Sequence, residues 1–341
     1  MKVDIALPAA DPAEAGRAAR AFEEHGFDGV LSFEGPHDPF LPLVLAAQAT
    51  TGLELTTAVA IALARNPMVC AYMANDLQLI SRGRFRLGLG SQIRPHIEKR
   101  FSQTWSRPNA RMREFVLAMR AIFRSWNERA PLRFEGEIYR HTLMPPFFSP
   151  GPNPFGPPPI LLAGFGPSMI EIAGEVADGW IIHPLHSVSY VDHVALPALH
   201  AGAARAGRDP ATIEISAQTI VMVGSDEAQI ARARQGARLQ LAFYGSTPAY
   251  RGMLEHHGWG ALQPELNRMT REGRWGEMSA LISDQMLAVV GVCGTPLEVG
   301  RKLRERNRFA RRTSLVLYDE TGDAATLATI LDGLRADGAA A

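Results

Sequence analysis

The strongest constraint on the fold is a regular alternation of short apolar runs with longer segments of helical spacing. Short apolar runs of this kind are typical of strands that are buried on both faces of a parallel sheet. The runs expected to be strands are 3–7, 29–33, 53–61, 85–89, 160–163, 180–183, 213–223 and 314–318. The segments expected to be helices are 11–25, 39–51, 67–81, 110–126, 168–177, 188–207, 226–241, 295–306 and 324–335. Because no hairpin turn joins consecutive strands, we expect parallel strands linked by right-handed crossovers.

Eight strands, each followed by a helix, indicate an α/β fold and, within that class, a (β/α)8 TIM barrel. The competing fold is a doubly wound open sheet, which usually has a glycine-rich turn after its first strand. Residues 7–11, which follow the first strand here, contain no glycine. We therefore predict a single barrel domain over residues 1–341. It should carry a hairpin-and-loop insertion after helix four (about 129–159) and a helical insertion after strand seven (about 242–287).

Charge and cysteine content exclude several classes of function. The 35 basic residues balance the 35 acidic residues, which argues against electrostatic binding of nucleic acid or of an anionic membrane surface. No apolar run is long enough to span a membrane, and the N-terminus has the pattern of a strand. The two cysteines, Cys70 and Cys293, lie far apart and lack the spacing of metal ligands. We expect a cytoplasmic protein with free thiols.

The loop after strand two is the first candidate for chemistry, because active sites of TIM barrels lie at the C-terminal ends of the strands. It contains Glu34, His37 and Asp38. Asp38 precedes Pro39 and is best explained as the cap of the second helix, whereas Glu34 and His37 are candidate catalytic residues. After strand three, Asn66 stands before Pro67 as an expected helix cap. Arg65 is either a solvent-exposed residue or a contact for an anion.

Glycines mark two further strand ends. Gly88 and Gly90 interrupt strand four, which requires either tight packing inside the barrel or a ligand close to the backbone. Strand five leads through Gly164 and Gly166 directly into a helix, an arrangement that can bind phosphate with backbone amides and the helix N-terminus. Residues 94–100 form a basic cluster, which is either a solvated helix face or an anion contact. His183 and His186 follow strand six without a carboxylate or cysteine cluster, so we expect no metal site.

Several of these segments together resemble the luciferase-like monooxygenase family. The resemblance rests on residues 80–90 (Ile-Ser-Arg-Gly-Arg-Phe-Arg-Leu-Gly-Leu-Gly), 159–167, 175–179, the turn at 65–67 and residues 294–299, and it covers nearly the whole chain. Residues 243–250 and 257–259 are similar to an actinobacterial branch of F420-dependent oxidoreductases. Members that bind this deazaflavin often carry a further glycine and an acidic residue where this chain has Gln92 and Ile93.

The resemblance implies a cofactor, a reaction and a set of site residues. It implies hydride transfer between the deazaflavin coenzyme F420 and a small organic substrate, with Glu34 or His37 exchanging a proton. The alternatives are an FMN-dependent monooxygenase that uses oxygen, and a non-catalytic cofactor-binding barrel. A non-proline cis peptide is expected at Ala58–Val59. The expected cofactor-binding residues are Ala58, Val59, Gly88, Gly90, Ser91, Gln92, Ala163, Gly164, Phe165, Gly166, Pro167 and Ser168.

Two expectations concern the surface. The insertion at 242–287 would form a lid over the substrate, although its Tyr244, Tyr250, His257 and Trp259 fit ordinary packing equally well. Related barrels often pair through their second and third helices, and the apolar content of residues 69–79 permits a homodimer there.

Overall fold

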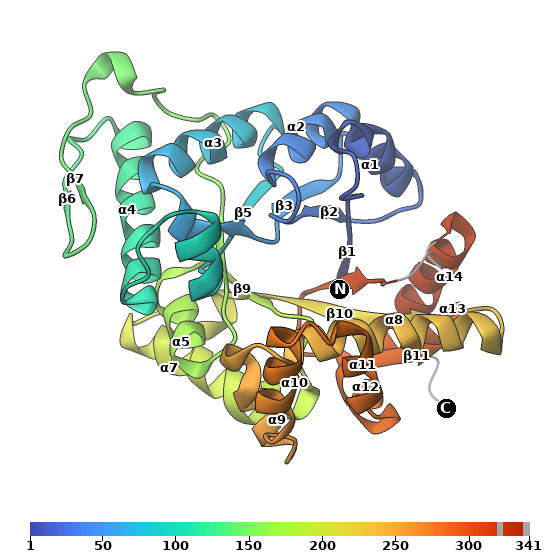
Figure 1. Cartoon of the computed structure of the whole chain (residues 1–341). Coiled ribbons are helices and arrows are strands. Elements are labelled where there is room, and N and C mark those ends of the chain that lie inside the picture. Colours follow the sequence, from blue (N-terminus) through green and yellow to red (C-terminus); the bar gives the residue numbers. More distant parts are fainter. Residues whose placement is uncertain (319–322, 337–341) are drawn as a thin grey trace.

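Eight strand positions form a closed parallel barrel in the computed structural model, which describes residues 1–318 and 323–336 (Figure 1). Around the barrel the strands are β1 (Lys2–Ala6), β2 (Gly29–Ser32), β3 (Glu54–Thr57), β5 (Phe85–Gly90), β8 (Ile160–Ala163), β9 (Gly179–Ile182), β10 (Glu214–Val223) and β12 (Arg312–Val316). Each strand pairs in parallel with the next, and β12 pairs with β1 to close the ring. The predicted (β/α)8 barrel is confirmed.

Helices follow the strands and cover the outside of the barrel. They are α1 (Ala15–Glu24), α2 (Phe40–Ala49), α3 (Pro67–Ile80), α4 (Pro108–Glu128), α5 (Pro167–Val176), α6 (Val188–Tyr190) with α7 (Leu196–Arg205), α8 (Glu227–Gly245), α13 (Pro296–Arg306) and α14 (Ala324–Arg335). Asn66 caps α3 by accepting from the Met68 amide at 2.8 Å, and Glu298 completes the expected capping box of α13. The main hydrophobic core lies between the sheet and these helices.

The third strand differs from the single run expected at 53–61. It breaks after Thr57 and resumes as β4 (Ala60–Ile61), which pairs with Leu89 and Gly90 of β5. The peptide bond between Ala58 and Val59 is cis, as the family resemblance implied. The chain therefore bulges between β3 and β4, at the C-terminal end of the third strand.

A further parallel strand, β11 (Gly291–Gly294), was not expected from the sequence and pairs with residues Ile220–Val223 of β10. Its sequence, Gly-Val-Cys-Gly, is short and has one β-branched residue, so it carries little strand signal of its own. The strand begins directly after α12 (Asp284–Val290), the last helix of the second insertion. Pairing with the long strand β10, which extends beyond β9, stabilises this segment.

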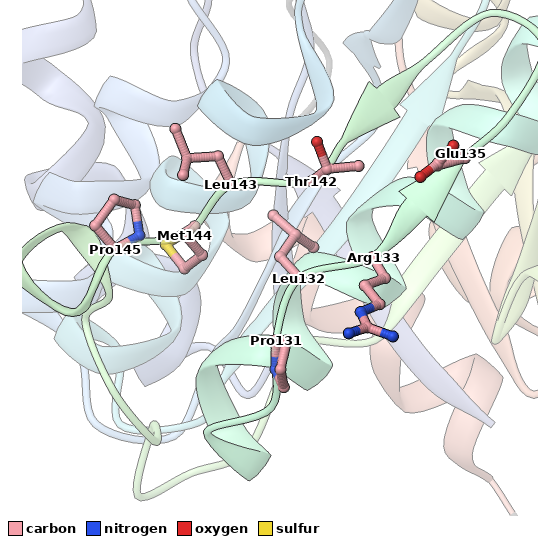
Figure 2. Close-up of a pocket in the computed structure, with 8 residues that line it drawn as sticks. All are labelled: Pro131, Leu132, Arg133, Glu135, Thr142, Leu143, Met144 and Pro145. Carbon is pink, nitrogen blue, oxygen red and sulfur yellow. The ribbon is translucent and has the colours of Figure 1, made fainter.

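The first insertion contains the expected hairpin, formed by the antiparallel strands β6 (Phe134–Glu135) and β7 (Arg140–His141). Glu114 of α4 holds its turn, because the carboxylate accepts hydrogen bonds from the amides of Glu137, Ile138 and Tyr139 at 2.9–3.1 Å. Figure 1 shows this hairpin at one edge of the molecule, beyond α4. A hollow of about 620 Å³ lies on the same insertion (Figure 2).

The second insertion is helical, as expected, and packs through a hydrophobic cluster of its own. It comprises the last turn of α8, α9 (Arg251–His256), α10 (Leu262–Arg271), α11 (Trp275–Met278) and α12. Its cluster includes Ile220 and Met222 of β10 and also Leu185 and Tyr190, which follow β9. The insertion therefore rests on the C-terminal ends of β9 and β10. Within residues 1–318 and 323–336, no helix has the length and apolar character needed to cross a membrane.

The interior of the barrel is charged at the N-terminal ends of the strands. Arg312, almost completely buried, pairs with Asp4 and Glu54, and Arg86 pairs with Glu54 and Glu214. These five side chains come from β1, β3, β5, β10 and β12. This charged layer was not expected from the sequence. In TIM barrels the residues at this end stabilise the fold, and the functional residues lie at the opposite end, where the strands terminate.

Candidate active site

The loop after β2 is fixed to the bulge of the third strand. The Glu34 carboxylate accepts from the Ile61 amide at 2.7 Å and from Arg65, and the Glu34 amide donates to the carbonyl oxygen of Val59 at 3.1 Å. On the other side of the cis peptide, the Ala58 amide donates to Ser32 O at 2.8 Å. Glu34 therefore contacts the chain on both sides of Ala60 and holds the shape of the bulge.

Arg65 connects two carboxylates of the strand-two loop. Its guanidinium contacts Glu34 and donates to Asp38 Oδ2 at 2.9 Å, while Asp38 Oδ1 accepts from the Phe40 amide at 2.8 Å. The expected capping role of Asp38 is thus confirmed, and Arg65 is largely buried against carboxylates of the protein itself. Burial alone would lower the pKa of Arg65, but its contacts with Glu34 and Asp38 hold that pKa above its ordinary value.

His37 is placed differently from Glu34. It is exposed, and no hydrogen bond of the described residues involves its ring. It lines a small depression together with Phe33 and the loop that follows β1. Of the two candidate catalytic residues in this loop, His37 is therefore the one with a free side chain.

The glycines of β5 make room for neighbouring strands. A Cβ on Gly88 would overlap the carbonyl oxygen of Thr57 and lie 2.7 Å from Ile181 Cδ1, so tight packing inside the barrel explains this glycine. A Cβ on Gly90 would lie 2.7 Å from Val59 Cγ2, which belongs to the bulge. These contacts place β5 directly beside the cis peptide.

The chain leaves β5 through Ser91 and Gln92. Gln92 adopts a left-handed backbone conformation with φ of 60°, a region that favours glycine. The basic cluster that follows is largely engaged with protein. Arg94 pairs with Glu98 at 3.0 Å, and Arg100 donates to the carbonyl oxygen of Gly35 at 2.6 Å, joining this loop to the strand-two loop.

The turn after β8 leaves backbone amides free. Ala163 ends the strand, and Gly166 caps α5, accepting at its carbonyl from Met169 and Ile170. Among the described residues, the amides of Phe165, Gly166 and Ser168 donate to no acceptor. A Cβ on Gly166 would meet nothing within 4 Å, and Pro167 and Ser168 are exposed. Free amides beside a helix N-terminus suit an anion such as phosphate.

His183 lies at the centre of an aromatic cluster. Its ring centroid is 4.5 Å from those of Tyr244 and Tyr250 and 5.8 Å from that of Phe165. Tyr244 belongs to the last turn of α8, and its hydroxyl hydrogen-bonds that of Tyr318 at 2.8 Å. The second insertion therefore covers the ends of β8, β9 and β12. Tyr244 and Tyr250 were candidates from the sequence, but their contact with His183 depends on the folded insertion and was not expected.

Two serine–histidine hydrogen bonds attach the insertion to the loop after β9. His257 Nε2 lies 2.7 Å from Ser187 Oγ, and His256 Nε2 lies 2.8 Å from Ser189 Oγ. Trp259 stacks on His257 with 4.8 Å between ring centroids. These hydrogen bonds add to the hydrophobic packing of the insertion against Leu185 and Tyr190, which follow β9.

The hollow on the first insertion is unsuited to be the site. It is lined by residues 131–133, 135 and 142–145, of which Arg133 and Glu135 are the charged members (Figure 2). None of the candidate residues lines it. Across the part of the chain that the structure describes, no three potential metal ligands converge.

Comparison with known proteins gives a match along most of the chain. A family model described as luciferase-like monooxygenase matches residues 2–313. An uncharacterized protein of Mycobacterium tuberculosis is 50% identical over 306 residues, which are 90% of this chain and 90% of that protein. A 5,10-methylenetetrahydromethanopterin reductase of Archaeoglobus fulgidus is 28% identical over 295 residues, covering 84% of this chain and 83% of that protein.

Solved structures share the same barrel. The coenzyme F420-dependent tetrahydromethanopterin reductase of Methanopyrus kandleri has a TM-score of 0.76 and 21% identity, with 97% of each chain covered. The oxygenating constituent of 3,6-diketocamphane monooxygenase from Pseudomonas putida, in complex with FMN, has a TM-score of 0.68 and 16% identity, with 98% of this chain and 96% of that chain covered. At these identities the likeness establishes the fold.

Proposed function

The chain belongs to the luciferase-like monooxygenase family, and on that premise we propose that it transfers a hydride between the deazaflavin coenzyme F420 and a small organic substrate. The observation that carries the proposal is the turn Gly164–Ser168, with its free amides and open approach. The choice of F420 is supported by two relatives in sequence from M. tuberculosis that are described as F420-dependent, an oxidoreductase and a hydroxymycolic acid dehydrogenase.

The residues at the strand ends suit a flavin-like cofactor with a phosphate group. The amides of Phe165, Gly166 and Ser168 would hold the phosphate, with the N-terminus of α5 favouring its negative charge. The bulge at Ala58–Val59 would support the ring system. Gly88, Gly90, Ser91 and Gln92 would line the ring or the chain that joins it to the phosphate, with Ala163 and Pro167 flanking the turn. When bound in its reduced form, the cofactor supplies the hydride.

The contacts of the strand-two loop assign different roles to its two candidates. Glu34 is engaged with Ile61 and Arg65 and would act as a positioning residue for the bulge. His37 is free and exposed and would exchange the proton that accompanies hydride transfer. Replacing His37 with alanine should lower turnover and leave cofactor affinity nearly unchanged.

The second insertion would serve as the lid of the site. Tyr244 and Tyr250 cover His183 from above, and His256 and His257 attach the insertion to the loop after β9. Closing this segment would exclude water from the transferred hydride and would shape the substrate pocket.

An FMN-dependent monooxygenase is the second candidate. The P. putida neighbour binds FMN on the same fold, and a phosphate turn serves a flavin as well as a deazaflavin. Gln92 stands where deazaflavin-binding members often have glycine, although its left-handed conformation is the one that glycine adopts most easily. Oxygen consumption coupled to substrate would separate the two enzymes.

Cofactor titration tests the proposal. Purified apo-protein is titrated separately with F420 and FMN, and fluorescence gives each dissociation constant. We expect at least tenfold preference for F420. The variant Ser168→Asp places a negative charge at the second position of α5 and should weaken binding about tenfold or more.

Ala325→Asp is the matched control, because it places the same charge at the second position of α14. It should leave cofactor affinity unchanged. Preference for FMN would instead support the monooxygenase. Binding of neither cofactor, or equal binding by the Ser168→Asp variant, would overturn the assignment of the turn. Tight binding without turnover on a broad panel of ketones, alcohols and imines would indicate a non-catalytic barrel.

A further inference from the structure

His183 continues an inward-facing row of β9. Side chains alternate along a strand, so His183 faces the same side as Ile181. Ile181 Cδ1 approaches the interior position of Gly88, two strands away. His183 therefore lies above Ile181 at the mouth of the barrel, opposite the β2 side of the ring where His37 is placed.

Hydrogen bonds fix both the position of His183 and its tautomer. Its Nδ1 accepts from the Leu185 amide at 3.1 Å, so a neutral ring carries its proton on Nε2. The carbonyl oxygen of His183 accepts from His186 Nδ1 at 3.0 Å, and this hydrogen bond fixes the backbone at His183. Tyr244, Tyr250 and Phe165 restrict rotation of the ring.

The remaining nitrogen is available to a ligand. No hydrogen bond of the described residues involves His183 Nε2, and this atom is not among the buried atoms that lack a partner, whereas His186 Nε2 is. The residue as a whole is partly exposed. Burial of the ring lowers the pKa of His183 to about 3, so the ring stays neutral and its Nε2–H remains a donor at neutral pH.

We propose that His183 is a substrate-binding residue, whose Nε2–H donates a hydrogen bond to a carbonyl or hydroxyl oxygen of an uncharged organic substrate with an apolar or aromatic body. This inference rests on the proposed function, because it takes the mouth of the barrel as the substrate pocket. Phe165 and Tyr250 offer apolar ring surface beside the donor. A fixed donor next to aromatic surface selects a molecule with one acceptor oxygen on a hydrophobic body.

The test compares two probes of the same shape. Acetophenone has a carbonyl oxygen, and α-methylstyrene has a methylene group in its place. Both are titrated into the full-length protein with saturating cofactor, and affinity is measured by calorimetry. We expect the wild-type protein to bind acetophenone about tenfold more tightly. His183→Phe keeps an aromatic ring and should abolish the discrimination, whereas His183→Gln restores an amide donor and should recover part of it.

A spectroscopic readout accompanies the titration. With 15N-labelled histidine, the Nε2–H resonance of His183 should shift on addition of acetophenone and stay in place with α-methylstyrene. His200→Phe, at an exposed position of α7, is the control and should discriminate as the wild-type protein does. Discrimination that persists in His183→Phe, or wild-type protein that binds the two probes equally or binds neither, overturns the proposal.

Failure of this inference is distinguishable from failure of the proposed function. Cofactor affinity is measured on the same samples before the probes are added. The variants His183→Phe, His183→Gln and His200→Phe should bind F420 as the wild-type protein does, because neither His183 nor His200 belongs to the phosphate turn or to the bulge. Unchanged cofactor binding with no discrimination between probes rejects the role of His183 alone. Absence of cofactor binding in the wild-type protein rejects the proposed function.

Discussion

Replacement of Glu34 separates a positioning role from a proton-transfer role. Glu34→Gln keeps an oxygen that can accept from the Ile61 amide but removes the charge and the ability to exchange a proton. Glu34→Ala removes the acceptor oxygen as well as the charge and the ability to exchange a proton. If Glu34 positions the bulge, the glutamine variant should retain most cofactor affinity and turnover. The alanine variant should lose affinity at least tenfold, because the strand then loses its fixed shape beneath the cofactor.

The expected loss of stability follows from the burial of the pair. The Glu34 side chain is 7% exposed and that of Arg65 is 13% exposed, and breaking a buried pair by removing one partner costs about 3–5 kcal/mol. Arg65 keeps Asp38, whose side chain is 38% exposed, so the loss of the pair is partly offset. Leaving the Ile61 amide without an acceptor adds about 1–3 kcal/mol. We expect Glu34→Ala to lower the unfolding free energy by about 4 kcal/mol, the lower end of the two contributions together, and Glu34→Gln by about 1 kcal/mol.

Urea denaturation measures these stabilities, and fluorescence titration with F420 measures cofactor affinity. Glu24→Ala, which removes an exposed carboxylate at the end of α1, is the control and should change neither quantity. The positioning role would be refuted if both Glu34 variants bound F420 normally and were equally inactive. That result would identify Glu34 as the proton-transfer group.

Three further predictions concern stability and assembly. Burial lowers the pKa of His183 and His186 to about 3, so their contribution to stability is full above the unfolded pKa near 6.5 and is lost as the pH falls from there toward 3. Burial raises the pKa of Asp4 to about 6, which stabilises the fold as the pH falls and offsets part of this loss. Between pH 7 and 5.5 the unfolding free energy should fall by about 1–2 kcal/mol in urea denaturation, and by less in His186→Asn. Gly88→Ala should cost about 3 kcal/mol or prevent folding, because its Cβ overlaps Thr57 O, whereas Gly166→Ala, in open space, should stay within about 0.5 kcal/mol of the wild-type protein. Leu41, Val69, Leu79 and Ile80 expose apolar surface on α2, on α3 and at the end of α3, so we expect a homodimer there, and light scattering should find Val69→Arg to be a monomer while Leu239→Arg, on α8, assembles normally.

The barrel was predictable because each of its eight strand positions is followed by a helix in the sequence. A strand buried on both faces is mostly apolar, here with charged residues only toward the N-terminal ends, and a crossover helix is amphipathic, so the two patterns alternate. The strand at Gly291–Gly294 follows neither pattern, since it exists by pairing with the extension of β10 beyond β9. The first insertion was visible through the turn at Gly136. Its anchor, Glu114, was not, because the three amides that it accepts from lie 23–25 residues away.

For the candidate site too, the sequence predicts the features that depend on local pattern and topology, but not the contacts between distant residues. The topology of a barrel brings all strand ends to one face, so the loops at 34–38 and 164–168 could be named from the sequence alone. The residues that each of these side chains contacts could not be named from the sequence alone. Glu34 meets Arg65 across 31 residues, and His183 meets Tyr250 from an insertion whose packing the sequence left open. Local spacing predicts helix caps such as Asp38, whereas contacts between loops depend on the register of the closed sheet.

The distribution of charge inside the barrel bears on the substrate. Arg86, Arg312 and their carboxylate partners fill the N-terminal end, whereas the mouth presents His183, which is neutral, and the hydroxyls of Tyr244 and Tyr318. The two charged side chains that bind Ile61 next to the bulge, Glu34 and Arg65, pair with each other. A carboxylate brought beside His183 would lose its hydration without gaining a cation, which is costly in a desolvated pocket. Selection against charged molecules should therefore accompany selection by His183. Benzoate, which matches acetophenone in shape, should bind more weakly than acetophenone even though it offers two acceptor oxygens in place of one.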